Sequence, residues 1–196
     1  MLTAFATVVA IVAANRIIEL QLSRLRRRRL VARGAIPADE RGFALMVALH
    51  VAVLLGGVFE AAICARDPPV WLICMALAGV IAANVLRWWV IATLDEHWNV
   101  RVLDSTALGV VDTGPYRFVR HPNYVAVWLE LAALPLVAGA WITCVAGTIG
   151  HMFILARRIA LEERILLASG RYVQLMAHKP RFVPRAMQLG RWTWPR

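Results

Sequence analysis

One polar segment, Gly114–Tyr124, gathers residue types that could hold an anionic group. Its arginine and tyrosine side chains can donate hydrogen bonds to a carboxylate, and the proline after His121 favours a helix start, where N–H groups attract anions. The candidate binding residues are Gly114, Tyr116, Arg120, His121, Pro122 and Tyr124. An ordinary loop at a membrane surface, with arginine and tyrosine at the level of the lipid headgroups, explains the same composition, so both interpretations stay open.

A second group of candidates follows the last apolar run of the chain. Arg158 and Glu162 are four residues apart, so in a helix they lie one turn apart on the same face. Together with Glu163, these carboxylates could bind the amino group or ribose hydroxyls of a cofactor and offset its positive charge. A simple surface ion pair would use the same residues and contribute only a few tenths of a kcal/mol.

Ionisable residues also occur inside the apolar runs, where a charge at mid-bilayer costs about 2.5–3.5 kcal/mol. Glu60 and Glu130 are expected near helix ends, where water lowers this cost. His50 lies deeper, and either acts as a base beside a substrate or forms a hydrogen bond between helices. We interpret His151 as structural.

The elements that must position these residues are long apolar helices. Of the 196 residues, 60% are hydrophobic, and they are grouped in blocks about as long as the roughly 20 residues that cross a bilayer. The sequence therefore predicts an all-α integral membrane protein, organised as one domain over residues 1–196. About five transmembrane helices are expected at residues 2–20, 43–65, 70–94, 124–137 and 141–160. The fourth is short for a crossing.

The distribution of basic residues predicts the orientation, because cytoplasmic loops are enriched in Lys and Arg. With five crossings and the N-terminus outside, the inner segments 24–41, 95–123 and 157–196 hold 19 of the 22 Lys and Arg. Segments 95–123 and 157–196 would then form a cofactor region at the cytoplasmic face, and the basic, aromatic C-terminal tail would lie along the interface.

Composition also bears on partners. The net charge of +10 suggests nucleic acid in a soluble protein, but here basic residues flank apolar runs, where they contact membrane lipids, so no nucleic acid is expected. The three cysteines form no CxxC pair and no grouping with histidine, so no metal site is expected.

Considered together, the motifs of the C-terminal half resemble those of the isoprenylcysteine carboxyl methyltransferase superfamily. The motifs that carry this resemblance are Gly114-Pro-Tyr116, Arg120-His-Pro-Asn-Tyr124, Glu130, Arg158-Ile-x-x-Glu162-Glu163, Gly170-Arg-Tyr172 and Pro180-Arg-Phe182-Val-Pro184. The resemblance implies S-adenosyl-L-methionine as methyl donor, held by Tyr116, His121, Pro122, Tyr124 and Glu162 or Glu163. It further implies that Arg158 lies where cofactor and acceptor meet.

The N-terminal half resembles a bacterial branch of that superfamily associated with type III polyketide synthases. The shared elements are Asn15-Arg16-x-x-Glu19-Leu20, Arg33-Gly34, Met46-Val-Ala-Leu-His50, Trp98-x-x-Arg101-Val102 and Asn123-Tyr-Val-Ala-Val127. This resemblance implies O-methylation of a long-chain alkylpyrone or a phenolic lipid in the bacterial inner membrane, with the active site facing the cytoplasm. It also implies a functional link to a polyketide synthase.

Other functions fit the same sequence. The acceptor could be a prenylcysteine carboxylate or a phospholipid amine, and a non-catalytic membrane scaffold, a lipid-binding protein or a related NADPH-dependent membrane reductase are further alternatives. We expect in-line transfer of a methyl group, driven by positioning and exclusion of water. A neutral phenol would need a general base, for which His50 and Glu162 are the candidates, with Arg158 as the third catalytic candidate.

Overall fold

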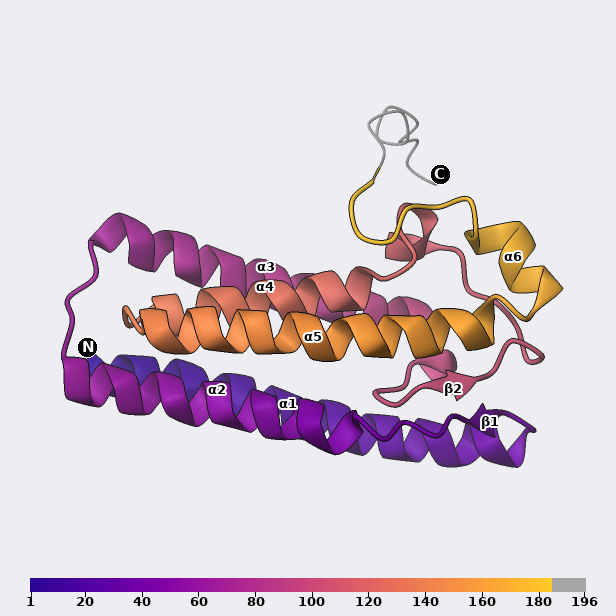
Figure 1. The fold of residues 1–196 in the computed structure, drawn as a ribbon, viewed down its shortest axis with the longest axis horizontal. Helices are drawn as coiled ribbons and strands as arrows, with labels where there is room; N and C mark the ends of the chain where they lie inside the picture. Colours follow the sequence, from indigo (N-terminus) through magenta and orange to yellow (C-terminus); the bar gives the residue numbers. More distant parts are fainter. Residues whose placement is uncertain (185–196) are drawn as a thin grey trace.

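The computed structural model describes residues 1–184, in which five long helices lie along one axis (Figure 1). These helices are α1 (Leu2–Ala32), α2 (Phe43–Cys64), α3 (Val70–Leu94), α4 (Pro122–Leu136) and α5 (Trp141–Leu166). Successive helices run in alternating directions. The N-terminus and the turns at residues 65–69 and 137–140 therefore lie at one end, and the longer connections lie at the other, where the candidate residues gather.

Short elements occupy that second end of the bundle. They are β1 (Ile36–Pro37), the 3₁₀ helices η1 (Asp95–His97) and η2 (Gly114–Arg117), β2 (Leu103–Asp104) and α6 (Gly170–Met176). The two strands pair antiparallel, with Ile36 opposite Asp104. This small ladder, which the all-α prediction did not include, ties the chain that follows α1 to the chain that follows α3.

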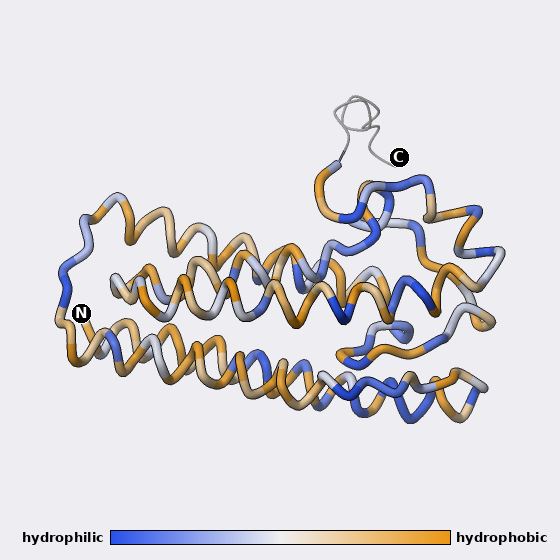
Figure 2. Tube along the Cα trace, viewed as in Figure 1, coloured by the Kyte–Doolittle hydropathy of each residue, from blue (hydrophilic) through white to orange (hydrophobic). Residues whose placement is uncertain are grey.

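Within residues 1–184, four helices are long and apolar enough to cross a membrane: α1, α2, α3 with η1, and α5. The prediction of a mainly helical integral membrane protein is thus confirmed. Helix α4 has only 15 residues, so five crossings and an outer N-terminus remain predictions. Figure 2 shows hydrophobic residues along the long helices and hydrophilic residues concentrated at the end that carries the β-ladder and α6.

The helix bundle exposes apolar side chains and buries charged ones, as expected for a protein whose surroundings are lipid. Phe59 and Phe153 are 68% and 72% exposed, whereas Glu19, Arg87 and Glu130 are almost fully buried. Exposing such aromatic side chains to water would be unfavourable, but in a bilayer they contact the acyl chains of the lipids.

Small residues allow the helices to approach closely. A Cβ added to Gly79 of α3 would lie 3.0 Å from the Cβ of Ala133 in α4, and one added to Gly147 of α5 would lie 2.5 Å from Val53 in α2. Close backbone approach is the usual source of helix association in lipid, where apolar burial adds little. These contacts hold α4 against α3 and α5 against α2.

Glu60 connects α2 to the start of α5 at the end of the bundle that lies far from the candidate site. Its carboxylate accepts hydrogen bonds from the amides of Ile142 and Thr143 at 3.1 and 2.8 Å, and from the Thr143 hydroxyl at 2.8 Å. Arg66 pairs with the same carboxylate at 2.7 Å. A side chain near the end of α2 therefore caps the first turn of α5, and the expectation that Glu60 lies near a helix end is confirmed.

Two helices extend well past their predicted ends. Helix α1 continues from residue 20 to Ala32 through the basic string, and α5 continues from residue 160 to Leu166. Apolar runs mark where lipid begins and ends, but arginine and glutamate are good helix formers in water. The backbone helix therefore continues after the apolar run stops, and Glu162 and Glu163 lie on α5 itself.

Candidate active site

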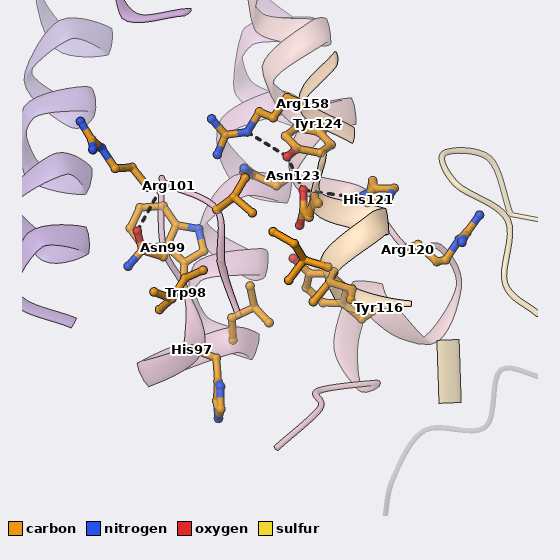
Figure 3. Close-up of a pocket in the computed structure, with 16 residues that line it drawn as sticks. His97, Trp98, Asn99, Arg101, Tyr116, Arg120, His121, Asn123, Tyr124 and Arg158 are labelled. Atoms are coloured by element: carbon orange, nitrogen blue, oxygen red, sulfur yellow. Dashed lines mark hydrogen bonds and ion pairs between the residues drawn. The ribbon is translucent and has the colours of Figure 1, made fainter. Parts of the chain in front are cut away.

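A polar cavity of about 100 Å³ lies at the end of the bundle that carries the short elements (Figure 3). Its walls come from the loop after η1, from η2, and from the facing ends of α4 and α5. The polar and aromatic residues that line it are His97, Trp98, Asn99, Arg101, Tyr116, Arg120, His121, Asn123, Tyr124, Arg158 and Glu162. A cavity of about 120 Å³ adjoins it and shares Tyr116, Arg120 and Glu162.

Tyr124 and Arg158 stand next to each other on one wall of the cavity (Figure 3). The Tyr124 hydroxyl accepts a hydrogen bond from Arg158 Nε at 2.9 Å and donates one to Glu162. Arg158 also pairs with Glu40 and donates to the carbonyl of Val100. The guanidinium is therefore fixed on three sides, and Arg158 and Glu162 share one pocket, as their spacing predicts.

The loop with Trp98 and Asn99 also lines the cavity, and it is held by the extension of α1. Ser23 donates a hydrogen bond to Asn99 Oδ1 at 3.0 Å and accepts one from the amide of Val100 at 2.9 Å. Glu40 accepts from the amide of Val102 at 3.1 Å. Without the turns of α1 that follow the apolar run, this loop would lose a principal support.

Glu163 points into an ion cluster and does not line the cavity. One of its oxygens lies 3.1 Å from His121 Nε2 and 3.2 Å from Arg120 Nη2, and Arg181 binds both oxygens, at 3.0 and 2.6 Å. The Glu163 side chain is only 7% exposed. The two adjacent glutamates thus face different surroundings: Glu162 faces the cavity, and Glu163 joins α5 to the start of α4 and to the C-terminal segment.

The C-terminal segment 177–184 packs against the start of α4. The amides of Arg120 and His121 donate to the carbonyls of Pro180 and Arg181 at 2.9 and 3.0 Å, so the chain just before α4 is hydrogen-bonded to this segment. Lys179 donates to the carbonyl of Tyr116 at 2.8 Å, and burial lowers the pKa of its amino group. Residues 185–196 of the predicted interfacial tail lie outside the described residues.

Tyr116 and Tyr172, which line the two adjoining polar cavities, remain hydrogen-bond donors. Burial raises the pKa of the Tyr116 phenol, and the negative charge of Glu162 raises it further. Burial likewise raises the pKa of Tyr172, which lines the adjoining cavity. Both phenols therefore keep their protons at physiological pH.

Gly114 and Pro122 support the site without lining the main cavity. Gly114 has a φ of +53°, and an added Cβ would overlap with Oγ1 of Thr93 in α3, so only glycine fits the turn that leads to Tyr116. Pro122 is fully buried in the first turn of α4, which it starts. Both residues therefore shape the backbone that presents Tyr116 and Tyr124 to the cavity.

A second, largely apolar pocket of about 290 Å³ lies deeper between the helices. It shares Trp98, Asn123, Tyr124 and Arg158 with the polar cavity, so those four residues form a common wall. The remaining lining residues come mainly from the first two helices, and they are Ala13, Arg16, Ile17, Glu19, Leu20, Met46, Val47, His50, Val51, Leu54, Arg87, Val100, Val127 and His151.

The mouth of this apolar pocket lies on the lipid-facing surface. Ile17 of α1 and Val51 of α2 both line the pocket and are 55% and 48% exposed. A lipophilic molecule could therefore enter between α1 and α2 without passing through water.

Four charged residues from three helices meet beside the apolar pocket. Arg16 pairs with Glu19 at 2.7 Å and lies 3.6 Å from Glu130, and Arg87 lies 3.7 and 3.6 Å from the same two carboxylates. Asn84 links Arg16 and Glu130. The expectation that Glu130 lies near a helix end is wrong, because it lies midway along α4 and is 3% exposed. Two arginines neutralise the two glutamates, so neither needs water.

Several buried polar atoms of the main cavity have no hydrogen-bond partner within residues 1–184. They are Asn99 Nδ2, Arg120 Nε and Asn123 Oδ1. Each such atom costs free energy unless a ligand or water satisfies it. The donors suit the carboxylate of S-adenosyl-L-methionine, while Asn123 Oδ1 and the Glu162 carboxylate suit its amino and hydroxyl groups. The residues present thus fit the implied cofactor, and Tyr116 and Trp98 offer aromatic surfaces for its adenine.

The site also contains residues that sequence reasoning did not select. Glu40 pairs with Arg158, but it stands beside Asp39 in the segment after α1, and the sequence carries no signal that distinguishes it. Trp98 belongs to the motif Trp98-x-x-Arg101-Val102, which by itself indicates no function for the tryptophan. Asn123 lies inside the polar segment Gly114–Tyr124, next to the candidates Pro122 and Tyr124. His50 lines only the apolar pocket, where it meets His151, which was interpreted as structural. No cluster of metal-binding side chains occurs in the described part of the chain.

Comparisons with known proteins agree with this arrangement. Residues 72–168 match the model of the isoprenylcysteine carboxyl methyltransferase (ICMT) family, a stretch that spans α3, the cavity loop, α4 and α5. The chain is 27% identical to the uncharacterized protein YpbQ of Bacillus subtilis over 162 residues, covering 83% of this chain and 96% of that protein. It is 30% identical to an uncharacterized protein of Haemophilus influenzae over 160 residues, covering 79% and 90%.

Proposed function

Because the chain belongs to the isoprenylcysteine carboxyl methyltransferase superfamily, we propose that it transfers a methyl group to a hydroxyl oxygen of a lipophilic acceptor. Members of this family are membrane methyltransferases that use S-adenosyl-L-methionine, so the reaction class follows from membership. The acceptor that we propose is a long-chain alkylpyrone or a phenolic lipid, which the resemblance of the N-terminal half favours.

The observation that carries the proposal is the common wall between the two pockets. The polar cavity offers hydrogen-bonding groups for a charged, water-soluble donor, and the apolar pocket offers a lipid-facing entrance for the acceptor. Tyr124 and Arg158 belong to both. A methyl group could therefore pass between the ligands at this wall while protein surrounds both and excludes water.

The residues of the chain have distinct parts in this proposal. Arg120, Asn99 and Glu162 hold the cofactor, which supplies an electrophilic methyl group when it is bound. Arg158, fixed by Glu40 and Tyr124, presents positive charge toward the acceptor oxygen and stabilises its anionic form. The Glu162 carboxylate is the nearest acceptor for a proton released at the wall.

Labelled S-adenosyl-L-methionine and a panel of acceptors would test the proposal on protein reconstituted in lipid nanodiscs. The panel holds an alkylpyrone, an alkylresorcinol, a prenylcysteine and a phosphatidylethanolamine. We expect label on the first two. Label on the prenylcysteine or the phospholipid alone would show that the acceptor is a different one from that proposed. Absence of label from all four compounds would refute the proposed function.

Two variants of α4 sharpen this test. Tyr124→Phe removes the hydroxyl that joins Arg158 to Glu162, and should lower kcat by at least about 30-fold, which corresponds to about 2 kcal/mol, the contribution of one hydrogen bond to a charged group. Trp128→Phe, one turn further along the helix and 43% exposed, should change kcat less than twofold. Binding of S-adenosylhomocysteine that is lost in His121→Ala would argue against a non-catalytic scaffold.

A further inference from the structure

Two histidines, one from α2 and one from α5, lie side by side in the lining of the apolar pocket. The ring centroids of His50 and His151 are 5.5 Å apart, with the planes perpendicular. His50 Nδ1 lies 2.7 Å from the carbonyl of Met46, which can only accept a hydrogen bond. Nδ1 therefore carries a proton, and in the neutral imidazole Nε2 presents a lone pair that can accept a hydrogen bond from a ligand.

His151 is buried and has unused hydrogen-bonding capacity. It is 1% exposed, and neither ring nitrogen has a hydrogen-bond partner within residues 1–184. A buried imidazole without partners is costly, so such an arrangement points to a ligand. A hydroxyl group fits this place well, because it can donate a hydrogen bond to one imidazole and accept one from the other.

The charged groups around the pocket are less suited than the histidines to accept a hydrogen bond from a ligand hydroxyl. Glu19 also lines the pocket, but its carboxylate is already paired with Arg16 and Arg87. Those two arginines have only N–H donors to offer, as does Arg158. Among these groups, the imidazoles are therefore the acceptors that are not held in an ion pair.

The histidine pair lies deeper in the membrane than the wall where transfer is proposed. His151 and Arg158 are seven residues apart on α5, so they share a face, with about 10 Å between their positions along the helix. Long side chains in helices lean toward the N-terminus, which brings the Arg158 guanidinium closer to His151. A ring that carries oxygens at two separated positions could place one at Tyr124 and Arg158 and another at the histidines.

We propose that His50 and His151 bind a second hydroxyl of the acceptor, one that is not methylated. The substrate class is then a lipophilic ring with two oxygen substituents, and such a ring is methylated once. This inference rests on the proposed function. At the reacting oxygen an O–H bond breaks and an O–CH₃ bond forms, the proton passes to the Glu162 carboxylate, and the sulfur of the donor keeps the electron pair of the broken S–CH₃ bond. The hydroxyl at the histidines is unchanged.

Binding without turnover tests the proposal directly. Affinities of an alkylresorcinol and its dimethyl ether are measured by equilibrium dialysis with protein in nanodiscs and no cofactor. The unaltered protein should bind the resorcinol at least tenfold more tightly, and His151→Phe should reduce this preference below twofold. Met152→Leu, a lipid-facing change at a residue 56% exposed, should keep it. Equal binding of the two compounds by the unaltered protein would overturn the proposal.

Product analysis supplies a second, independent readout. With S-adenosyl-L-methionine present, the unaltered protein should stop at the monomethyl ether, whereas His50→Gln and His151→Phe should give dimethyl ether as well. Retained binding of S-adenosylhomocysteine shows that these variants are folded. Dimethyl ether as a main product of the unaltered protein would contradict the proposal. Selective binding of the resorcinol without any methyl transfer would refute the proposed function and support the role of the histidines.

Discussion

Replacing Glu163 with glutamine would test whether this carboxylate acts on the cofactor site through Arg120. Glu163 lies outside the cavity lining, yet it fixes Arg120 at 3.2 Å and His121 at 3.1 Å. One charge-assisted hydrogen bond to a group this buried contributes about 2 kcal/mol. Arg181 is 55% exposed, so its share of the stabilisation is small. We therefore expect Glu163→Gln to weaken binding of S-adenosylhomocysteine about 30-fold.

A double-mutant cycle read by calorimetry in nanodiscs gives this prediction its control. Arg120→Gln alone should weaken binding by a similar factor, and the double variant should be hardly worse than either single one, because the two residues form one unit. If the two losses multiply, toward about a thousandfold, Glu163 contributes independently of Arg120 and our assignment of it to a positioning role is wrong. Unchanged affinity in Glu163→Gln would remove the ion cluster from the cofactor site altogether.

Three further substitutions have expected outcomes. Glu60→Gln weakens the cap of α5 and should lower the melting temperature by about 6 °C, at about 2 kcal/mol, without changing cofactor affinity, as thermal unfolding and calorimetry would show. Gly114→Ala should destabilise by about 1–2 kcal/mol and weaken cofactor binding, and Thr93→Ala should restore part of both, since the added Cβ meets the Thr93 side chain. Arg87→Met removes one of the two arginines that neutralise the buried Glu19 and Glu130 and should cost about 3 kcal/mol, whereas adding Glu130→Met should recover most of the thermal stability. Failure of either second substitution to rescue would contradict the contact on which it is based.

The helical membrane class and the grouping of cavity residues were predictable because each depends on a local pattern. Apolar runs place α2 and α3 at their observed starts. The four-residue spacing of Arg158 and Glu162 fixes a shared face once a helix forms. Both inferences need only the regular geometry of a helix.

What could not be predicted depends on which distant residues meet. Glu40 and Arg158 are 118 residues apart, and nothing near either residue indicates the other. The same holds for Arg87 and Glu130, whose charges looked costly alone and are compensated only when three helices pack together. Adjacent residues were also hard to separate: Glu162 and Glu163 differ by about 100° around α5, which is enough to put one in the cavity and the other in an ion cluster.

In the proposed reaction, the exposed residues Ile17 of α1 and Val51 of α2 that line the apolar pocket bear on which concentration of acceptor sets the rate. A ligand that enters past Ile17 and Val51 is drawn from one leaflet, so saturation would depend on its mole fraction in that leaflet and would fall when inert lipid is added at constant total amount. A methylated product has one hydroxyl fewer and prefers the hydrocarbon more than the substrate does. Its departure into the bilayer is then favourable, and membrane composition would set turnover as directly as any side chain.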